Sequence, residues 1–195
     1  MSQFQPRRIM GKWTQGYALD LHTISSIPIG HNEYGHTQFD TTRSEIGELL
    51  FRLKFRADKS TVPLLVSDAV DFLRRWDPAI DMIVPVPPSG TRAVQPVILL
   101  AEGIGAALPL PLMHAVTKTR DTPQLKNIFD LDARLAALEG AHAVDPGMTR
   151  GRKILLFDDL FRSGATMSAI ATALYEQGGA AEVFALTMTR TRSHQ

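Results

Sequence analysis

Residues 154–166 constrain the fold more than any other part of this sequence. They read Ile-Leu-Leu-Phe-Asp-Asp-Leu-Phe-Arg-Ser-Gly-Ala-Thr, an apolar run followed by two acids and a small polar loop. The apolar run follows a polar turn, which is typical of a central parallel strand buried on both faces. A helix is expected from Gly164 to Gln177, because Gly178-Gly179 would end it there. This order of strand, loop and helix predicts an α/β domain with a mostly parallel sheet.

The flanking sequence predicts further helices and strands around this unit. Thr42-Arg43-Ser44-Glu45 resembles a capping box, which would start a helix that runs to about Phe55. A second helix is expected over residues 62–76, because its apolar residues share one face and Asp77-Pro78 would end it. The remaining expected elements are strands at 82–86, 110–114, 153–157 and 183–189, a helix at about 91–107 and a short helix from about residue 132.

Length and composition favour one ordinary globular domain. The 195 residues, with 44% hydrophobic and 21% charged side chains, match the averages for such proteins. We expect residues 1–80 to form an N-terminal extension with helices, and residues 81–190 to form the core. No apolar run approaches the roughly 20 residues that cross a bilayer, and the start lacks the apolar run of a signal peptide. We therefore expect a cytoplasmic protein with no membrane partner.

The charge balance and the absence of cysteine exclude several classes of function. A net charge of +1 gives no bulk attraction to nucleic acid, and local pairs of basic residues are more often solvated surface. Nucleic acid is therefore disfavoured as a partner. Because the chain has no cysteine, it has neither disulfides nor thiolate zinc sites.

The two acids and the following loop predict a site for a phosphorylated sugar. Ligands of open parallel sheets collect beyond the carboxyl ends of the strands, where Asp158 and Asp159 would lie. Their carboxylates suit the vicinal hydroxyls of a ribose, or a nearby magnesium ion. Gly164 would let the backbone approach a phosphate, and Arg162 would add positive charge. The phosphate would be bound by backbone amides and hydroxyls at the helix start, from Ser163, Gly164, Ala165 and Thr166.

A simpler interpretation is that the acids only cap a helix after a core strand. That interpretation is the better one for an isolated Asp-Asp pair, but it explains neither the second acid nor the Ser-Gly-Ala-Thr loop. The sequence has no G-x-x-x-x-G-K-[ST] loop of nucleoside triphosphatases. Gly103-Ile104-Gly105 lacks a third glycine and lies late in a helical run, which disfavours dinucleotide binding. The complete pattern therefore favours the sugar phosphate.

Residues 154–166 resemble the phosphoribosyl-pyrophosphate motif of type I phosphoribosyltransferases, and the chain is most similar to their ComF-type branch. The resemblance covers about residues 81–190, including Val84-Pro85-Val86-Pro87, Thr122-Pro123-Gln124-Leu125 and Gly140-Ala141-His142-Ala143-Val144. It implies a twisted, mostly parallel sheet flanked by helices, with an N-terminal hood. ComF-type proteins usually carry a four-cysteine zinc ribbon near the N-terminus, so this chain would represent a branch without that ribbon.

The resemblance implies a magnesium-dependent transfer of a phosphoribosyl group from 5-phosphoribosyl-1-pyrophosphate to, or from, a nitrogenous base or amine. Pyrophosphate would be the leaving group. Asp158 and Asp159 would hold the ribose hydroxyls and contact the metal. Arg162 stands where the family commonly has a hydroxyl residue and hypoxanthine-guanine enzymes have an acid, so purine salvage by that route is disfavoured.

Two further loops have implied roles. The loop Pro87 to Gly90, followed by Thr91 and Arg92, resembles the pyrophosphate-binding loop, with an ordinary Pro-Gly turn as the alternative. Its substrate-binding residues would be Pro88, Ser89, Gly90 and Arg92. Lys118 and Arg120 occupy the position of the family's flexible loop, which brings positive charge over the reacting centre. A solvated basic loop is the alternative for these two residues.

The acceptor pocket of this superfamily is a variable hood outside the core sheet, which here would come from residues 13–40. That segment is rich in polar and aromatic side chains, namely His22, His31, Glu33, Tyr34, His36 and Asp40. A β-hairpin with surface histidines is the alternative. Metal binding by the histidines is disfavoured, because their spacing does not define a tetrahedral site.

A rival function also follows from the resemblance, a non-catalytic ComF-type sensor of nucleotides or phosphoribosyl pyrophosphate, linked to DNA uptake or nucleotide metabolism. Arg92, Lys118 and Arg120 favour an enzyme, because sensing a 5′-phosphate alone needs no charges for a leaving group. A homodimer is compatible with the sequence.

Overall fold

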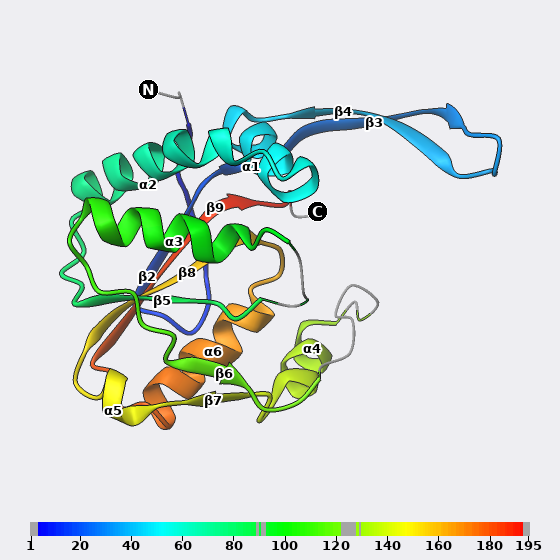
Figure 1. Cartoon of the computed structure of the whole chain (residues 1–195). Coiled ribbons are helices and arrows are strands. Elements are labelled where there is room, and N and C mark those ends of the chain that lie inside the picture. Colours follow the sequence, from blue (N-terminus) through cyan, green and yellow to red (C-terminus); the bar gives the residue numbers. More distant parts are fainter. Residues whose placement is uncertain (1–3, 89, 91–92, 122–127, 129, 193–195) are drawn as a thin grey trace.

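A five-stranded sheet forms the centre of the computed structural model, which describes residues 4–88, 90, 93–121, 128 and 130–192 (Figure 1). The strand order is β1-β2-β9-β8-β5, with β1 antiparallel at one edge and the other four strands parallel. The strands are β1 (Arg7–Arg8), β2 (Gln15–Leu21), β5 (Met82–Pro85), β8 (Lys153–Phe161) and β9 (Glu182–Arg190). This confirms the predicted α/β class with a mostly parallel sheet.

Helices cover both faces of the sheet (Figure 1). One face packs against α1 (Glu45–Arg56), α2 (Val62–Trp76) and α3 (Pro96–Ala107), and the short η1 (Lys59–Thr61) joins the first two. The other face packs against α6 (Ala165–Glu176). Of the helices within the described residues, none combines the length and apolar character needed to cross a membrane.

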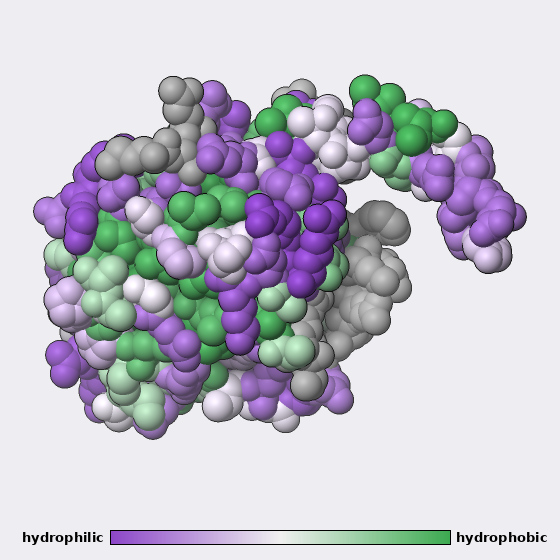
Figure 2. Space-filling model, turned by 45° about the horizontal axis from the view of Figure 1, so that its top comes forward, coloured by the Kyte–Doolittle hydropathy of each residue, from purple (hydrophilic) through white to green (hydrophobic). Residues whose placement is uncertain are grey.

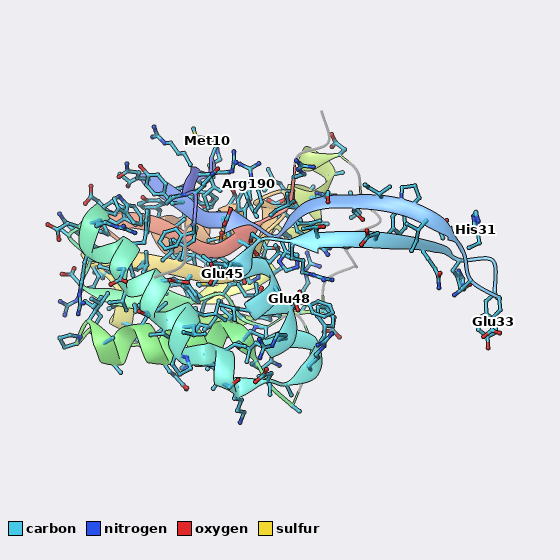
Figure 3. The ribbon with its side chains drawn as sticks, turned by 90° about the horizontal axis from the view of Figure 1, so that it is seen from above. Met10, His31, Glu33, Glu45, Glu48 and Arg190 are labelled. Carbon is cyan, nitrogen blue, oxygen red and sulfur yellow. The ribbon has the colours of Figure 1, made fainter. Side chains whose placement is uncertain are left out.

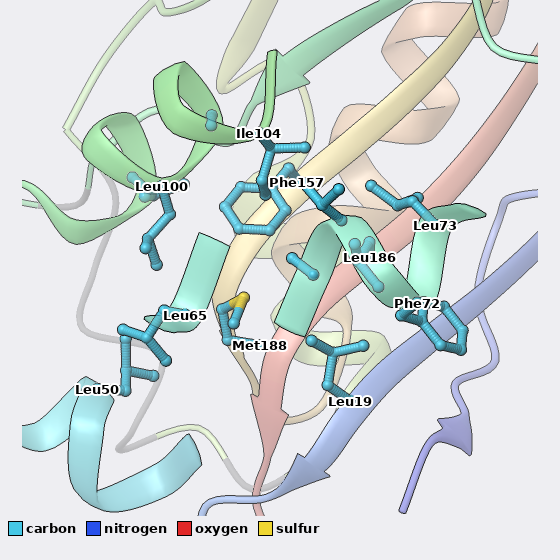
Figure 4. Close-up of a cluster of buried hydrophobic side chains, with 14 of the residues drawn as sticks. Leu19, Leu50, Leu65, Phe72, Leu73, Leu100, Ile104, Phe157, Leu186 and Met188 are labelled. Atoms are coloured by element: carbon cyan, nitrogen blue, oxygen red, sulfur yellow. The ribbon is translucent and has the colours of Figure 1, made fainter. Parts of the chain in front are cut away.

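The strand periodicity of β8 divides the core into two clusters. Leu155 and Phe157 point to the side of α1, α2 and α3, whereas Ile154 and Leu156 point to the side of α6. Figure 4 shows the first cluster, in which Phe157 and sheet residues of β9 face leucines from the three helices. Because both faces of β8 are apolar and buried, this strand is central, as its continuous apolar run predicts.

Two pairs of strands lie outside the main sheet. β3 (Thr23–His31) and β4 (Thr37–Arg43) form an antiparallel hairpin that extends from the body as an arm, residues 23–43 (Figures 1 and 3). Figure 2 shows a green, hydrophobic area on the arm, and the exposed aliphatic and phenylalanine side chains there are Ile24, Ile27, Ile29 and Phe39. The hairpin alternative is therefore confirmed from residue 23 onward, with His31 and His36 exposed, whereas residues 15–21 belong to the main sheet as β2 and His22 is only partly exposed.

A second ribbon lies on the α6 side of the sheet. It consists of β6 (Val116–Lys118) and β7 (His142–Val144), which pair antiparallel. Between them lies α4 (Leu131–Leu138), and β7 is followed by the short α5 (Pro146–Thr149). Lys118, which the resemblance assigns to the flexible loop, is therefore the last residue of β6.

Several predicted elements need correction. The N-cap of α1 is Ser44 rather than Thr42. Thr42 belongs to β4, which pairs with β3. α3 begins at Pro96, because proline suits the first turn of a helix and not its interior. Residues 110–114 form only a single bridge, between Leu112 and Ile83. β8 runs beyond residue 157 to Phe161, because β9 continues to pair with it as far as Arg190.

Candidate functional site

The carboxyl end of β8 carries both acids of the motif and leads directly to the start of α6. Asp158 and Asp159 lie within the strand, with Asp158 opposite Thr187 of β9. β5 ends beside them, because Pro85 pairs with Phe157 and the Val86 amide donates to the Phe157 carbonyl at 2.8 Å. The predicted arrangement of acids, loop and helix start at one edge of the sheet is therefore present.

Asp158 is in an environment that favours its neutral form. Its Oδ1 accepts a hydrogen bond from the Asp159 amide at 2.8 Å. Burial raises the pKa of Asp158 well above its ordinary value, and the neighbouring Asp159 carboxylate raises it further. Asp158 is therefore harder to ionise than an exposed aspartate.

Asp159 has a partner that the sequence does not indicate. This residue is 9% exposed, and the Lys54 ammonium donates to its Oδ2 at 2.7 Å. Lys54 lies on α1, outside the residues that carry the family resemblance. The sequence around Lys54 shows only that it follows the apolar Leu53 on an amphipathic helix. This predicts a hydrophobic core close to Lys54 but no acidic partner for it.

The helix start after the acids has free backbone donors. The N-cap of α6 is Gly164, with a φ of 77° and no side chain that could accept from the first helix amides. The Ala165 amide lies 3.5 Å from Ser163 Oγ, beyond the usual hydrogen-bond length of about 2.7–3.2 Å. Arg162 is exposed beside this loop, and Ser163 and Thr166 are partly buried. This geometry suits an anion at the positive end of the helix.

The reason for a glycine at position 164 differs from the one that the sequence predicts. A Cβ there would lie 2.7 Å from Cε2 and 2.8 Å from Cζ of Phe161. The space beside Gly164 is therefore filled by an aromatic ring rather than left for a phosphate. Gly164 is required by its left-handed backbone and by this ring.

Of the N-terminal residues expected to recognise an acceptor, His22 lies beside the acids. Its Nδ1 is 3.1 Å from Thr189 Oγ1 at the end of β9. Burial lowers the pKa of His22, and the positive charges of Arg43, Lys54 and Arg162 lower it further, whereas Asp159 opposes them. His31 and Glu33 lie at the far end of the arm (Figure 3). The other three, also exposed on the arm, are Tyr34, His36 and Asp40.

The predicted pyrophosphate loop follows β5 at the same edge of the sheet. Pro88 is partly buried and Gly90 is exposed, whereas Ser89 and Arg92 lie outside the described residues. The Gly90 carbonyl accepts a hydrogen bond from Gln95 Nε2 at 2.8 Å. The role of this loop stays a prediction.

Arg120 binds backbone at the end of α4. Its Nη2 donates to the carbonyls of Ala137 and Glu139, each at 3.0 Å. Lys118 is exposed on β6, opposite His142. Burial lowers the pKa of His142, and Lys118 and Arg120 lower it further. Lys118 therefore lies on the ribbon, and Arg120 contacts the end of α4. Their role at the reacting centre stays a prediction.

The acids fit a metal ion that arrives with a diphosphate better than one held by protein alone. Within the described part of the chain, no three His, Asp or Glu side chains gather as a metal site would require. Asp158 and Asp159 supply carboxylate oxygens, but one of these already accepts from Lys54. Magnesium is commonly bound by one or two carboxylates together with phosphate oxygens of the substrate.

The chain is similar in sequence to the competence protein ComFC of Bacillus subtilis (strain 168), with 29% identity over 145 residues. The match covers 74% of this chain and 59% of ComFC, so the chain spans less than two thirds of that relative. No protein-family model matches the chain.

Solved structures show a similar fold. The glutamine phosphoribosylpyrophosphate amidotransferase from B. subtilis, complexed with ADP and GMP, has a TM-score of 0.50 at 17% identity, over 80% of this chain and 34% of that one. Adenine phosphoribosyltransferase from Saccharomyces cerevisiae has a TM-score of 0.48 at 16% identity, over 84% and 82% of the two chains. The expected type I phosphoribosyltransferase fold and the resemblance to ComF-type proteins are confirmed.

Proposed function

We propose that this protein, which has the type I phosphoribosyltransferase fold, binds 5-phosphoribosyl-1-pyrophosphate and transfers its phosphoribosyl group to or from a nitrogenous base or amine. The observation that carries this proposal is the start of α6, whose N-cap Gly164 has no side chain, shortly after the two acids of β8. A ligand for this arrangement needs an anionic group and hydroxyls a few ångströms apart. A ribose 5-phosphate has both.

The 5′-phosphate would accept hydrogen bonds from the backbone amides of residues 164–166. The ribose hydroxyls would then reach the acids and donate to their carboxylate oxygens. Pro87 and Pro88 follow the adjacent strand β5, and the loop that they begin would bind the pyrophosphate. Magnesium, when bound with the diphosphate, would offset its negative charge.

In the transfer, a nitrogen of the acceptor forms a bond to the anomeric carbon of the ribose. The bond from that carbon to the pyrophosphate oxygen breaks, and its electrons leave with pyrophosphate. Positive charge develops on the sugar, and the Asp159 carboxylate would help to stabilise that charge. His22, at the same edge of the sheet, would contact the acceptor.

Calorimetric titration with phosphoribosyl pyrophosphate and magnesium tests the binding site. The double variant Asp158→Asn/Asp159→Asn should bind at least about tenfold more weakly, a loss of about 1.4 kcal/mol. The control Asp77→Asn/Glu102→Gln neutralises two exposed carboxyl groups outside the motif and should bind like the native protein. Equal affinities in both double variants would contradict the assignment of the acids.

A sensor without turnover is the second candidate, and the hydrogen bonds of Arg120 favour it. This guanidinium binds the end of α4, whereas an enzyme would need its charge near the leaving group. The similarity to ComFC, a competence protein by name, suggests the setting of such a sensor. Pyrophosphate release with any member of a panel of bases and amines would support the enzyme. Binding of phosphoribosyl pyrophosphate without release across the panel would support the sensor.

A further inference from the structure

The ion pair between Lys54 and Asp159 places a fixed positive charge inside the proposed ligand site. Nζ and Oδ2 are 2.7 Å apart, and the two side chains are only 19% and 12% exposed. Because little water screens it, this pair differs from the exposed ion pairs of a protein surface, which contribute little. Lys54 therefore influences what else can bind Asp159.

The position of Lys54 is determined by the packing of α1. Leu50 and Leu53 are fully buried in the core beneath the helix. The helix backbone also lies directly against the end of β2, because a Cβ at Gly47 would be 2.2 Å from the His22 carbonyl oxygen. At the other end, Arg52 pairs with Asp58 just after the helix. Lys54 thus projects from a well-anchored helix.

The chemistry of the acids gives this charge a specific consequence. A free divalent cation binds a carboxylate pair through its negative charge, so it competes with an ammonium ion that is already there. A neutral hydroxyl does not compete in this way, because it can donate to the second oxygen of Asp159 while Lys54 remains on the first.

We propose that Lys54 is the resident counter-ion of the Asp158 and Asp159 pair, and that it makes the pair select sugar hydroxyls over free divalent cations. A metal ion then enters this site with the diphosphate that it coordinates, rather than before it. The inference rests on the proposed function, whose acids it concerns, and it adds a residue that determines their specificity.

Binding of Mn²⁺ alone, followed by electron paramagnetic resonance, tests the proposal without any sugar phosphate. Mn²⁺ prefers the same carboxylate ligands as Mg²⁺. Lys54→Met should bind Mn²⁺ at least about tenfold more tightly than the native protein. Lys54→Gln, which keeps a polar group, should change the affinity in the same direction and serves if the Met variant does not fold. Lys59→Met removes an exposed charge near the same helix and should leave the affinity unchanged.

A double variant shows whether the gain involves the acid. Asp159→Asn added to Lys54→Met should abolish the increase in Mn²⁺ affinity. A lysine that only links α1 to β8 would change stability and not Mn²⁺ binding. Native affinity for Mn²⁺ in folded Lys54→Met and Lys54→Gln would therefore overturn the proposal, as would a gain that survives Asp159→Asn.

The two proposals fail in different ways. If Mn²⁺ affinity does not change but phosphoribosyl pyrophosphate still binds, the role of Lys54 is wrong and the proposed function stands. If Mn²⁺ affinity rises as expected but phosphoribosyl pyrophosphate does not bind, the counter-ion role stands and the proposed ligand is wrong.

Discussion

Replacing Gly164 with alanine tests how the loop before α6 is built. The backbone there has a φ of 77°, and a new Cβ would lie 2.7 Å from the Phe161 ring. That ring is buried and packs edge-on against Trp13, with centroids 6.2 Å apart, so it has little room to move. Gly164→Ala therefore has two costs, one from the backbone and one from the ring.

The magnitude follows from these two costs. A residue with a Cβ in the left-handed region loses about 1–2 kcal/mol. Displacing a packed side chain by one extra carbon adds about 1–3 kcal/mol. Gly164→Ala should therefore lower the free energy of unfolding by about 2–5 kcal/mol. Gly151 has a φ of 70°, and a Cβ there would meet no atom within 4 Å, so Gly151→Ala should show only the backbone cost of about 1–2 kcal/mol.

Urea denaturation of both alanine variants measures the difference. Phe161→Leu shortens the side chain that meets the new methyl group, so a double-mutant cycle of Gly164→Ala with Phe161→Leu should show a favourable coupling of about 1 kcal/mol or more. Equal losses in Gly164→Ala and Gly151→Ala, together with no coupling to Phe161→Leu, would refute the reasoning.

Two further predictions concern the cap of α1 and the pKa of Asp158. Ser44 Oγ accepts from the Gly47 amide at 3.0 Å and donates to the Leu21 carbonyl. Ser44→Ala should therefore lower the free energy of unfolding, measured by thermal denaturation, by about 1–2 kcal/mol. Thr42→Ala, at an exposed position, should lower it by less than about 0.5 kcal/mol. Similar losses for the two variants would contradict the observed cap. Because the pKa of Asp158 is raised in the folded state, native stability should fall as pH rises above the ordinary value of 3.8, while Asp158→Asn should escape this loss. The melting temperatures of Asp158→Asn and the native protein can be compared from pH 4, about the ordinary aspartate pKa, to pH 8. A constant difference over this range would refute the burial of this carboxyl group.

Local patterns in the sequence predict much of this fold. The apolar run before Asp158, the two acids and the small residues after them lie next to one another in the chain, so they form a strand, a loop and a helix start wherever the sheet assembles. The helix over residues 62–76 is found with the expected bounds, since its periodicity and its ending at Asp77-Pro78 are equally local. Such features depend on backbone preferences and on the alternation of apolar residues.

Tertiary structure decided the features that join distant parts of the chain. Lys54 and Asp159 are 105 residues apart, and only the packing of α1 on the sheet brings their charges together. The pairing of β4 with β3 takes Thr42 into a strand and leaves Ser44 as the cap. The Phe161 ring fills the space beside Gly164 because β8 continues beyond the acids. In each case the outcome depends on which neighbours the fold supplies, since a side chain's hydrogen bonds, charge and available space are properties of its surroundings as well as of its residue type.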